Sequence, residues 1–280
     1  MTKGEKHQFI AYSVLSLAAL LTVVILVLIL LYVASRGIKV INIEFLLGYP
    51  RKMGSEGGIF PAIVGTFYLI GATMLVATPI GVGAAIYLNE YTRRSTATSV
   101  IRFATEALAG IPSIVFGLFG FAFFVILLKP ITGGWSIISG ALTGVTMILP
   151  TLVRASEEAL KAVPDTLREG SLALGTTRWQ TIRRVVLPCA FPGILTGIIL
   201  SIGRVIGETA AFLLTLGGSL LLPTALTNGG RTLSLHLYMV AMETGAMDVA
   251  FGTGAVLVIV IICINLLARW FTKKLMARMQ

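Results

Sequence analysis

Long apolar runs without a charged residue alternate along the chain with shorter polar segments. A helix needs about 20 apolar residues to cross a bilayer. Runs close to or above that length predict six membrane-spanning helices, at residues 8–35, 57–89, 107–128, 130–153, 185–203 and 249–268. Residues 209–216 are again apolar, so the fifth helix is expected to continue through Arg204 and Glu208 to about Leu216. The pattern therefore predicts an all-α, polytopic membrane helix bundle.

The composition excludes a water-soluble enzyme. Hydrophobic residues make up 56% of the 280 positions, charged residues only 12%, and the mean hydropathy is +0.93. Soluble domains carry about 25% charged residues. The two cysteines, Cys189 and Cys263, lie in apolar runs, and the two histidines, His7 and His236, are far apart in the sequence. We therefore expect no disulfide framework, no metal site and no cofactor bound by this chain.

The distribution of Lys and Arg predicts the orientation. The net charge is +10, and the cytoplasmic loops of membrane proteins are enriched in basic residues. With the N-terminus inside, the cytoplasmic segments hold 15 of the 22 Lys and Arg: 1–7, 89–106, 154–184 and 269–280. The outer segments hold six, of which four lie in residues 36–58. We expect both termini in the cytoplasm. The first run has 28 residues, longer than a signal-peptide core of about 7–15, and predicts a retained helix.

The chain divides into three parts, none of which can hold a soluble domain. Residues 1–58 comprise the first span and an outer loop, residues 59–268 the core of the bundle, and residues 269–280 a cytoplasmic tail. The core includes a cytoplasmic loop at residues 154–188. The sequence contains no phosphate-binding loop of the G-x-x-x-x-G-K-[ST] type. If ATP drives this protein, another chain must bind it.

The segment 154–184 predicts two short helices joined at a glycine corner. Pro164 suits the start of a helix, where its missing N–H costs nothing. Gly175 is placed to end that helix in the left-handed conformation, and Thr176 or Thr177 can cap the next helix. An amphipathic loop that packs under its own bundle would show the same periodicity.

This loop also carries a motif. Residues 169–175 read Glu-Gly-Ser-Leu-Ala-Leu-Gly, and after nine further residues the chain reads Val-Val-Leu-Pro. The spacing resembles the E-A-A---G---------I-x-L-P loop of ABC importer permeases, with the small residues Gly170 and Ser171 in place of the two alanines. In that family the loop forms a coupling helix that docks on a separate ATPase subunit. The resemblance implies these coupling residues: Glu169, Gly170, Ser171, Ala173, Gly175, Leu187 and Pro188.

Arg204 and Glu208 are charged residues inside the predicted fifth span. A charge at that depth costs at least about 2.5 kcal/mol, so each should face water or a partner. In a continuous helix their four-residue spacing puts both on one face. One interpretation is a structural ion pair. The other, which we favour, is a substrate path in which Arg204 attracts an anion while Glu208 holds the arginine in place.

Two patterns carry a closer family resemblance. Residues 110–117 read Gly-Ile-Pro-Ser-Ile-Val-Phe-Gly, and residues 204–211 read Arg-Val-Ile-Gly-Glu-Thr-Ala-Ala. Both are typical of the phosphate-specific ABC permeases, the PstA and PstC pair. The likeness covers about residues 59–268, and the short N-terminal part is more similar to the PstA type. The alternatives are a PstC-type partner or a sulfate or molybdate permease, which typically continues Arg-x-x-Gly-Glu with Phe-Gly.

The pattern at residues 110–117 has a local interpretation of its own. Pro112 fits a helix start, which we expect here. The alternative is a break in the span, whose free N–H groups would assist a passing anion.

The resemblance implies both a fold and an assembly. The fold would be that of a type I ABC importer permease, multi-pass in the plasma (inner) membrane of a prokaryote. This chain, itself not an enzyme, would form half of a phosphate path. Its partners would be a second permease subunit, two ATPase subunits that bind ATP and magnesium, and an extracytoplasmic phosphate-binding protein.

Other classes of membrane protein fit less well. A proton-coupled secondary transporter could also carry an intramembrane Arg–Glu pair, but it would not need the docking loop and usually shows internal repeats. A structural scaffold has no reason to retain an arginine at that depth. A membrane-embedded enzyme would need a catalytic cluster, and the sequence offers none.

Overall fold

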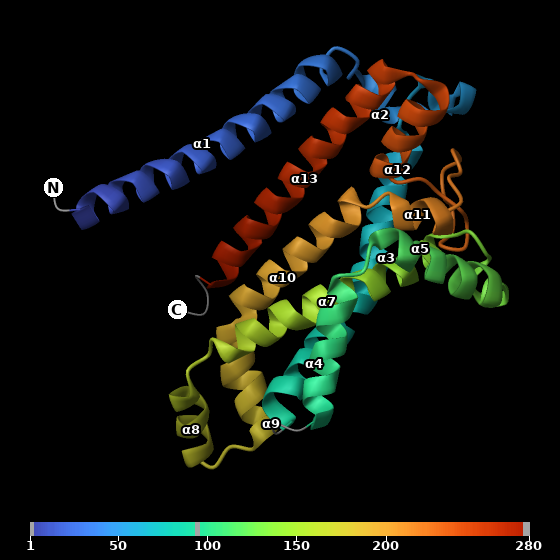
Figure 1. Cartoon of the computed structure of the whole chain (residues 1–280). Coiled ribbons are helices and arrows are strands. Elements are labelled where there is room, and N and C mark those ends of the chain that lie inside the picture. The colour runs from blue at the N-terminus through green and yellow to red at the C-terminus, as the bar shows by residue number, and fades with distance from the viewer. Residues whose placement is uncertain (1–2, 93–95, 277–280) are drawn as a thin grey trace.

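The computed structural model describes residues 3–92 and 96–276, which are built almost entirely of helices (Figure 1). The helices are α1 Lys3–Gly37, α2 Ile43–Leu47, α3 Phe60–Ile86, α4 Thr96–Ala109, α5 Ser113–Gly120, α6 Lys129–Thr132, α7 Ile137–Lys161, α8 Asp165–Ala173, α9 Arg178–Thr181, α10 Leu187–Gly207, α11 Ala210–Thr215, α12 Leu233–Met239 and α13 Met247–Met276. Turns of π-helix follow several of them: Tyr87–Tyr91 after α3, Phe121–Leu127 after α5, Ile182–Val186 after α9 and Val240–Thr244 after α12. A small antiparallel hairpin pairs β1 (Pro50–Arg51) with β2 (Glu56–Gly57) across the turn Lys52–Gly54.

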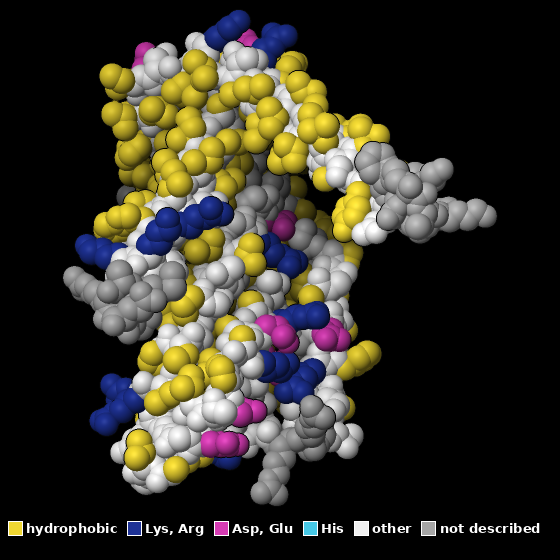
Figure 2. Space-filling view, turned by 90° about the vertical axis from the view of Figure 1, so that its left-hand side faces the viewer, with side chains coloured by type: hydrophobic (Ala, Val, Ile, Leu, Met, Phe, Trp, Pro, Cys, Tyr) yellow, Lys and Arg dark blue, Asp and Glu magenta, His cyan; other side chains and the backbone are white. Residues whose placement is uncertain are grey.

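Long apolar helices confirm the predicted polytopic membrane bundle. Five in the described chain are long and apolar enough to cross a membrane: Ala11–Gly37, Phe60–Tyr91, Ile137–Lys161, Arg178–Gly207 and Met247–Lys274. A sixth span exists if α4 and α5, which are bent by 101°, count as one. Figure 2 shows hydrophobic side chains covering much of one face, with Lys, Arg, Asp and Glu gathered towards its lower part and its upper rim.

The predicted bounds of the fourth span are wrong. α7 begins at Ile137, not near residue 130, after Ser136 accepts the N–H of Ser139. It also continues about two turns beyond Val153, through residues predicted as loop. The helix can carry charge there because Glu157 is paired, 2.6 Å from Arg102 on α4.

The predicted third span is broken at a corner. α4 ends at Ala109 and α5 begins at Ser113, after Pro112. Proline lacks an N–H and disfavours helical geometry in the residue before it, Ile111. The motif at residues 110–117 is therefore a helix start and also a break in the chain direction.

α7 lies at the centre of the bundle, packed against α3 and α10 (Figure 1). Leu69 of α3, Leu152 of α7 and Phe212 of α11 are fully buried in the largest core cluster. Small residues allow this approach, since a Cβ placed on Gly81 of α3 would lie 2.9 Å from Leu152. Close contact through small residues is the usual means of helix association in membranes.

α1 stands apart from this core. Its C-terminal end contacts the first turns of α13, and the rest of its described apolar side chains are exposed (Figure 1). The largest core cluster is thus built from α3, α5, α7, α10, α11 and α12.

Candidate functional site

The loop after α7 forms two short helices joined at a glycine corner, as the sequence predicts. α8 starts directly after Pro164, and Gly175 has a φ of +81°, in the left-handed region. Thr177, rather than Thr176, caps α9 in a capping box with Gln180. The Gln180 N–H donates to the Thr177 hydroxyl at 3.3 Å, and the Thr177 N–H donates to the Gln180 side chain at 2.9 Å.

The hydroxyl groups of Ser171, Thr176 and Thr181 contact one another at the corner between α8 and α9. The Ser171 Oγ lies 2.9 Å from Thr176 Oγ1 and 3.0 Å from Thr181 Oγ1, and the two threonine oxygens are 2.9 Å apart. The Thr176 hydroxyl also donates to the Ser171 carbonyl at 2.8 Å. Ser171 of α8 therefore contacts Thr181 of α9 both directly and through Thr176, which gives the small residue at position 171 a structural role.

The outer surface of this loop is apolar and has no cover within the described chain. Leu174 is 86% exposed, Trp179 53% and Leu167 42%. Glu169, Gly170, Ala173 and Gly175 of the predicted coupling set are exposed in the same loop. Apolar groups rimmed by polar residues on a surface mark an interaction site.

Leu187 and Pro188, the other two residues of the set, lie elsewhere. They are half-buried at the start of α10, where they line a cleft of about 640 Å³ together with α3. The chain runs as helix from Arg178 to Gly207, so Pro188 lies inside a long span and not at its start. These two residues face α3 across the cleft and contribute nothing to the exposed surface of the loop.

The predicted continuation of the fifth span through Glu208 is wrong. α10 ends at Gly207, Glu208 is extended with ψ of 133°, and a separate helix α11 starts at Ala210. The carboxylate of Glu208 accepts the Ala211 N–H at 3.2 Å, while its carbonyl accepts the Ser234 hydroxyl at 2.8 Å. The helix break leaves the Ala211 N–H and the Glu208 carbonyl without helical partners, and both find other hydrogen-bond partners, so the break is stable.

Arg204 and Glu208 are consequently not on one helical face. The Arg204 guanidinium donates to the Thr151 hydroxyl of α7 at 3.3 Å, and among the described residues no ion pair joins it to Glu208. Arg204 is half-buried and faces the central helix. The two residues flank the helix break, and the predicted ion pair is not formed.

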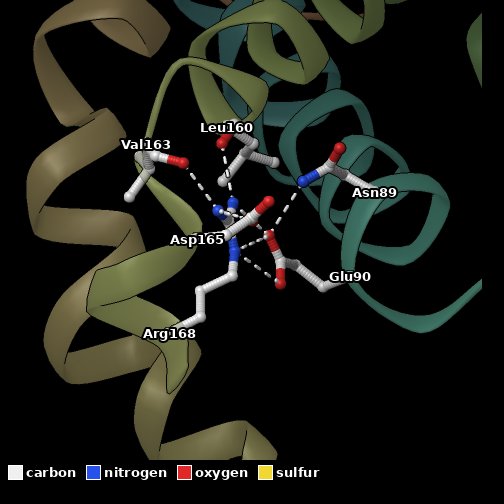
Figure 3. Close-up of polar contacts among 6 residues, drawn as sticks. All are labelled: Asn89, Glu90, Leu160, Val163, Asp165 and Arg168. Carbon is white, nitrogen blue, oxygen red and sulfur yellow. Dashed lines mark hydrogen bonds and ion pairs between the residues drawn. The ribbon is translucent and has the colours of Figure 1, made fainter. Parts of the chain in front are cut away.

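Sequence reasoning missed a cation that ties the loop to the bundle. The Arg168 guanidinium contacts Glu90, at the end of α3, with Nη2 to Oε1 at 2.9 Å (Figure 3). It also donates to the carbonyls of Leu160 and Val163, at 2.8 and 2.6 Å. A weak signal exists in the sequence: Glu90 is the first charge after the apolar run 57–89.

A second buried cation, Arg231, comes just before α12, which lies at the opposite end of the molecule from α8 (Figure 1). Arg231 donates through Nε to the Gly218 carbonyl at 2.7 Å, and its Nη1 lies 3.5 Å from His236 Nδ1. His236, on the short helix α12, is 1% exposed. Burial, and then the charge of Arg231, lower the pKa of His236 to about 4, so the ring is neutral at pH 7.

Known proteins provide an independent comparison. A family model for the inner membrane component of binding-protein-dependent transport systems matches residues 77–280. The chain belongs to this family. The matched region contains the loop of α8 and α9, Arg204 and the break at Glu208.

This permease has relatives along nearly its whole length. It is 37% identical to the probable ABC transporter permease protein YqgI of Bacillus subtilis, which it matches over 93% of both chains. It is 32% identical to the phosphate transport system permease protein PstA of Haemophilus influenzae, over 87% of this chain and 86% of the relative. PstA 1 of Mycobacterium tuberculosis is 40% identical, over 76% of this chain and 69% of the relative.

Solved structures confirm the expected fold, that of a type I ABC importer permease. A chain of a bacterial alginate ABC transporter, in complex with an alginate pentasaccharide-bound periplasmic protein, matches with a TM-score of 0.71 at 17% identity, over 97% and 96% of the two chains. The methionine ABC transporter MetNI, in an inward-facing conformation, matches with a TM-score of 0.58 at 19% identity, over 78% of this chain and 94% of that chain.

Proposed function

We propose that this chain is the PstA-type permease of an ATP-driven phosphate importer. It forms half of the translocation path and converts the closure of a separate ATPase into a change in that path. The observation that carries the proposal is the exposed docking loop: two short helices around Gly175, with uncovered apolar side chains, in a chain that holds no phosphate-binding loop of its own.

The loop surface suits a protein partner. Leu167, Leu174 and Trp179 present apolar area, and aromatic residues are enriched where protein surfaces meet. ATP and magnesium would be bound by the partner ATPase, of which the complex contains two copies. Residues 165–177 would provide the contact, with Glu169 and Gly175 fixing the shape of the docking element.

The choice of phosphate is supported by two observations. PstA proteins from Haemophilus influenzae and Mycobacterium tuberculosis are 32% and 40% identical to this chain. Arg204 also brings a guanidinium into a membrane-spanning helix without an opposing carboxylate among the described residues. Guanidinium matches a phosphate edge with two parallel N–H groups, so this side chain can compensate the charge of a passing anion.

The proposed assembly also implies an orientation of this chain in the membrane. Both termini and the α8 loop would be cytoplasmic, in the plasma (inner) membrane of a prokaryote. The hairpin and α12, at the opposite end, would face an extracytoplasmic phosphate-binding protein. A second permease would complete the path, and selectivity would be set mainly by the binding protein, because a deep site within the membrane would slow release.

Affinity purification from the native membrane tests the assembly. The tagged chain should recover a second permease, an ATPase and a phosphate-binding protein. Radiolabelled phosphate uptake by proteoliposomes that contain this complex should require ATP and should resist excess sulfate and molybdate. Uptake of sulfate or molybdate in preference to phosphate would contradict the proposed substrate. Recovery without any ATPase would contradict the proposed class of transporter.

A further inference from the structure

Besides its chain connections, the helix α8 contacts the membrane bundle through the charged side chain of Arg168. In the described chain α8 has no fully buried residue, and it packs mainly on α9 and on the turn Ile182–Val186. Asp165 and Glu169 are exposed. The Arg168 side chain points towards Glu90, and it is only 16% exposed.

The guanidinium of Arg168 joins three elements (Figure 3). Its Nε and Nη2 both contact the Glu90 carboxylate, at the π-helical end of α3. Nη2 and Nη1 also donate to the carbonyls of Leu160 and Val163, where α7 ends. A cation is favourable at that position, because the last carbonyls of a helix carry partial negative charge.

The contact is geometrically stiff. A planar guanidinium that meets a carboxylate with two N–H groups resists rotation as well as separation. The Glu90 side chain is 9% exposed, so salt and water screen the pair much less than they screen a surface pair. α3 and α7, the two elements held here, also pack along each other through the centre of the bundle.

We propose that Arg168 and Glu90 are positioning residues of the transport cycle. They form a strut that passes a displacement of α8 directly to α3 and α7. The inference rests on the proposed function, because it requires that α8 receives the movement of an ATPase. The strut adds a side-chain route into the bundle to the two chain connections of α8, which run through residues 162–164 to α7 and through α9 into α10.

Glu90→Gln is the informative change. It keeps the shape of the side chain and removes the charge that faces Arg168. The arginine would retain the carbonyls of Leu160 and Val163 and the carboxylate of Asp165, 3.0 Å from Nη1. The variant should therefore fold. Glu90→Asp keeps the charge, and Glu158→Gln is the control, because Glu158 forms only an exposed ion pair with Lys161.

Purified complexes in proteoliposomes should separate coupling from docking. We expect Glu90→Gln to retain the co-purified ATPase and its hydrolysis, while phosphate imported per ATP falls about tenfold, as for the loss of one charge-assisted contact. Glu90→Asp should recover part of the phosphate imported per ATP, and Glu158→Gln should give the wild-type value. A wild-type ratio in Glu90→Gln would overturn the strut. Loss of the ATPase from that variant would also overturn it, since the pair would then shape the docking surface itself.

A second measurement does not depend on the substrate. Spin labels at Thr166 of α8 and Tyr87 after α3, both exposed, report the separation of these elements in the assembled complex. With the strut intact, the distance should be the same with and without trapped nucleotide. In Glu90→Gln, nucleotide should shift or broaden it. If nucleotide had the same effect on this distance in the wild type and in Glu90→Gln, the strut would be contradicted, even if phosphate proved to be the wrong substrate. Failure of the proposed function would instead appear as a wild-type complex that lacks an ATPase.

Discussion

At the scale of single residues, the partner of a charge matters more than its place in the sequence. Arg204 and Glu208 are four positions apart, yet the arginine donates to Thr151 of α7 while the glutamate accepts an N–H of α11. Arg168 and Glu90 are 78 positions apart and form a close pair. A sequence pattern can place a charge in a helix, but only packing decides which group meets it.

Arg204 gives the first prediction. Arg204→Ala should reduce phosphate import about 10- to 100-fold while the complex still assembles, because a charge-assisted contact is worth about 1.5–3 kcal/mol. Arg204→Lys should keep part of the activity, since the charge remains without the planar fork. Uptake normalised to assembled complex measures the effect.

Glu208→Gln provides the comparison. Its amide oxygen can still accept the Ala211 N–H, so this variant should be milder than Arg204→Ala. Wild-type uptake by assembled Arg204→Ala complex would remove Arg204 from the path. Failure of that variant to assemble would make the arginine a structural residue.

His236 gives a prediction on pH. Its pKa is about 4 in the folded protein and 6.5 in the unfolded chain, so between these values only the unfolded state gains the proton. The contribution to stability is complete above pH 6.5 and declines as the pH falls to 4, by about 3 kcal/mol in total. Thermal unfolding at pH 7.5 and 5.0 should show the loss. His236→Asn should show a flatter dependence, and equal pH slopes for the two proteins would refute the assignment.

At the scale of elements, the local sequence predicts a turn such as the one at Gly175. It does not predict where a helix ends when that end depends on residues far away in the sequence. Gly175 was predictable because left-handed geometry is a property of the residue itself. The end of α10 was not, because it depends on the hydroxyl of Ser234, which lies 26 positions away from Glu208. The extent of α7 was missed for the same reason: Glu157 can lie in a helix because Arg102 of α4 is beside it.

The glycine corner gives the third prediction. Gly175→Val should leave the bundle folded, since a Cβ there meets nothing within 4 Å, but a β-branched residue at φ +81° costs about 1–2 kcal/mol. The loop should change shape and retain less ATPase during purification. Glu169→Lys should have the same effect by reversing an exposed charge. Gly71→Val is the control, because Gly71 lies in α3 with open space around it. Normal uptake by both loop variants would mean that ATPase docking occurs elsewhere.

At the scale of the whole molecule, charge and apolar length together set the arrangement in the membrane. Apolar runs identify which parts of the chain span, and the structure corrects where each span begins and ends. The segment 36–58 holds four Lys and Arg although the predicted topology places it outside, and it contains α2 and the β hairpin at the end opposite α8. The strands in that hairpin were not predicted, because each has only two residues.

The orientation is the fourth prediction. With Cys189 and Cys263 replaced by serine, Leu221→Cys should react with an impermeant thiol reagent in intact cells, whereas Leu174→Cys should react only after the membrane is opened. The two sites are matched in exposure, at 76% and 86%. The reverse labelling pattern would overturn the proposed topology.

The continuous helical span from Arg178 to Gly207, which includes the π-helical turn Ile182–Val186, has a mechanical consequence. It begins at the capped corner between α8 and α9 and ends at the break beside Arg204. The 30 residues of this helix extend about 45 Å at 1.5 Å per residue. A rod of that length acts as a lever: a tilt of about 5° at the loop end sweeps its far end through about 4 Å. That sweep exceeds a hydrogen-bond length, so a small tilt of this helix relative to α7 is enough to separate Arg204 from Thr151.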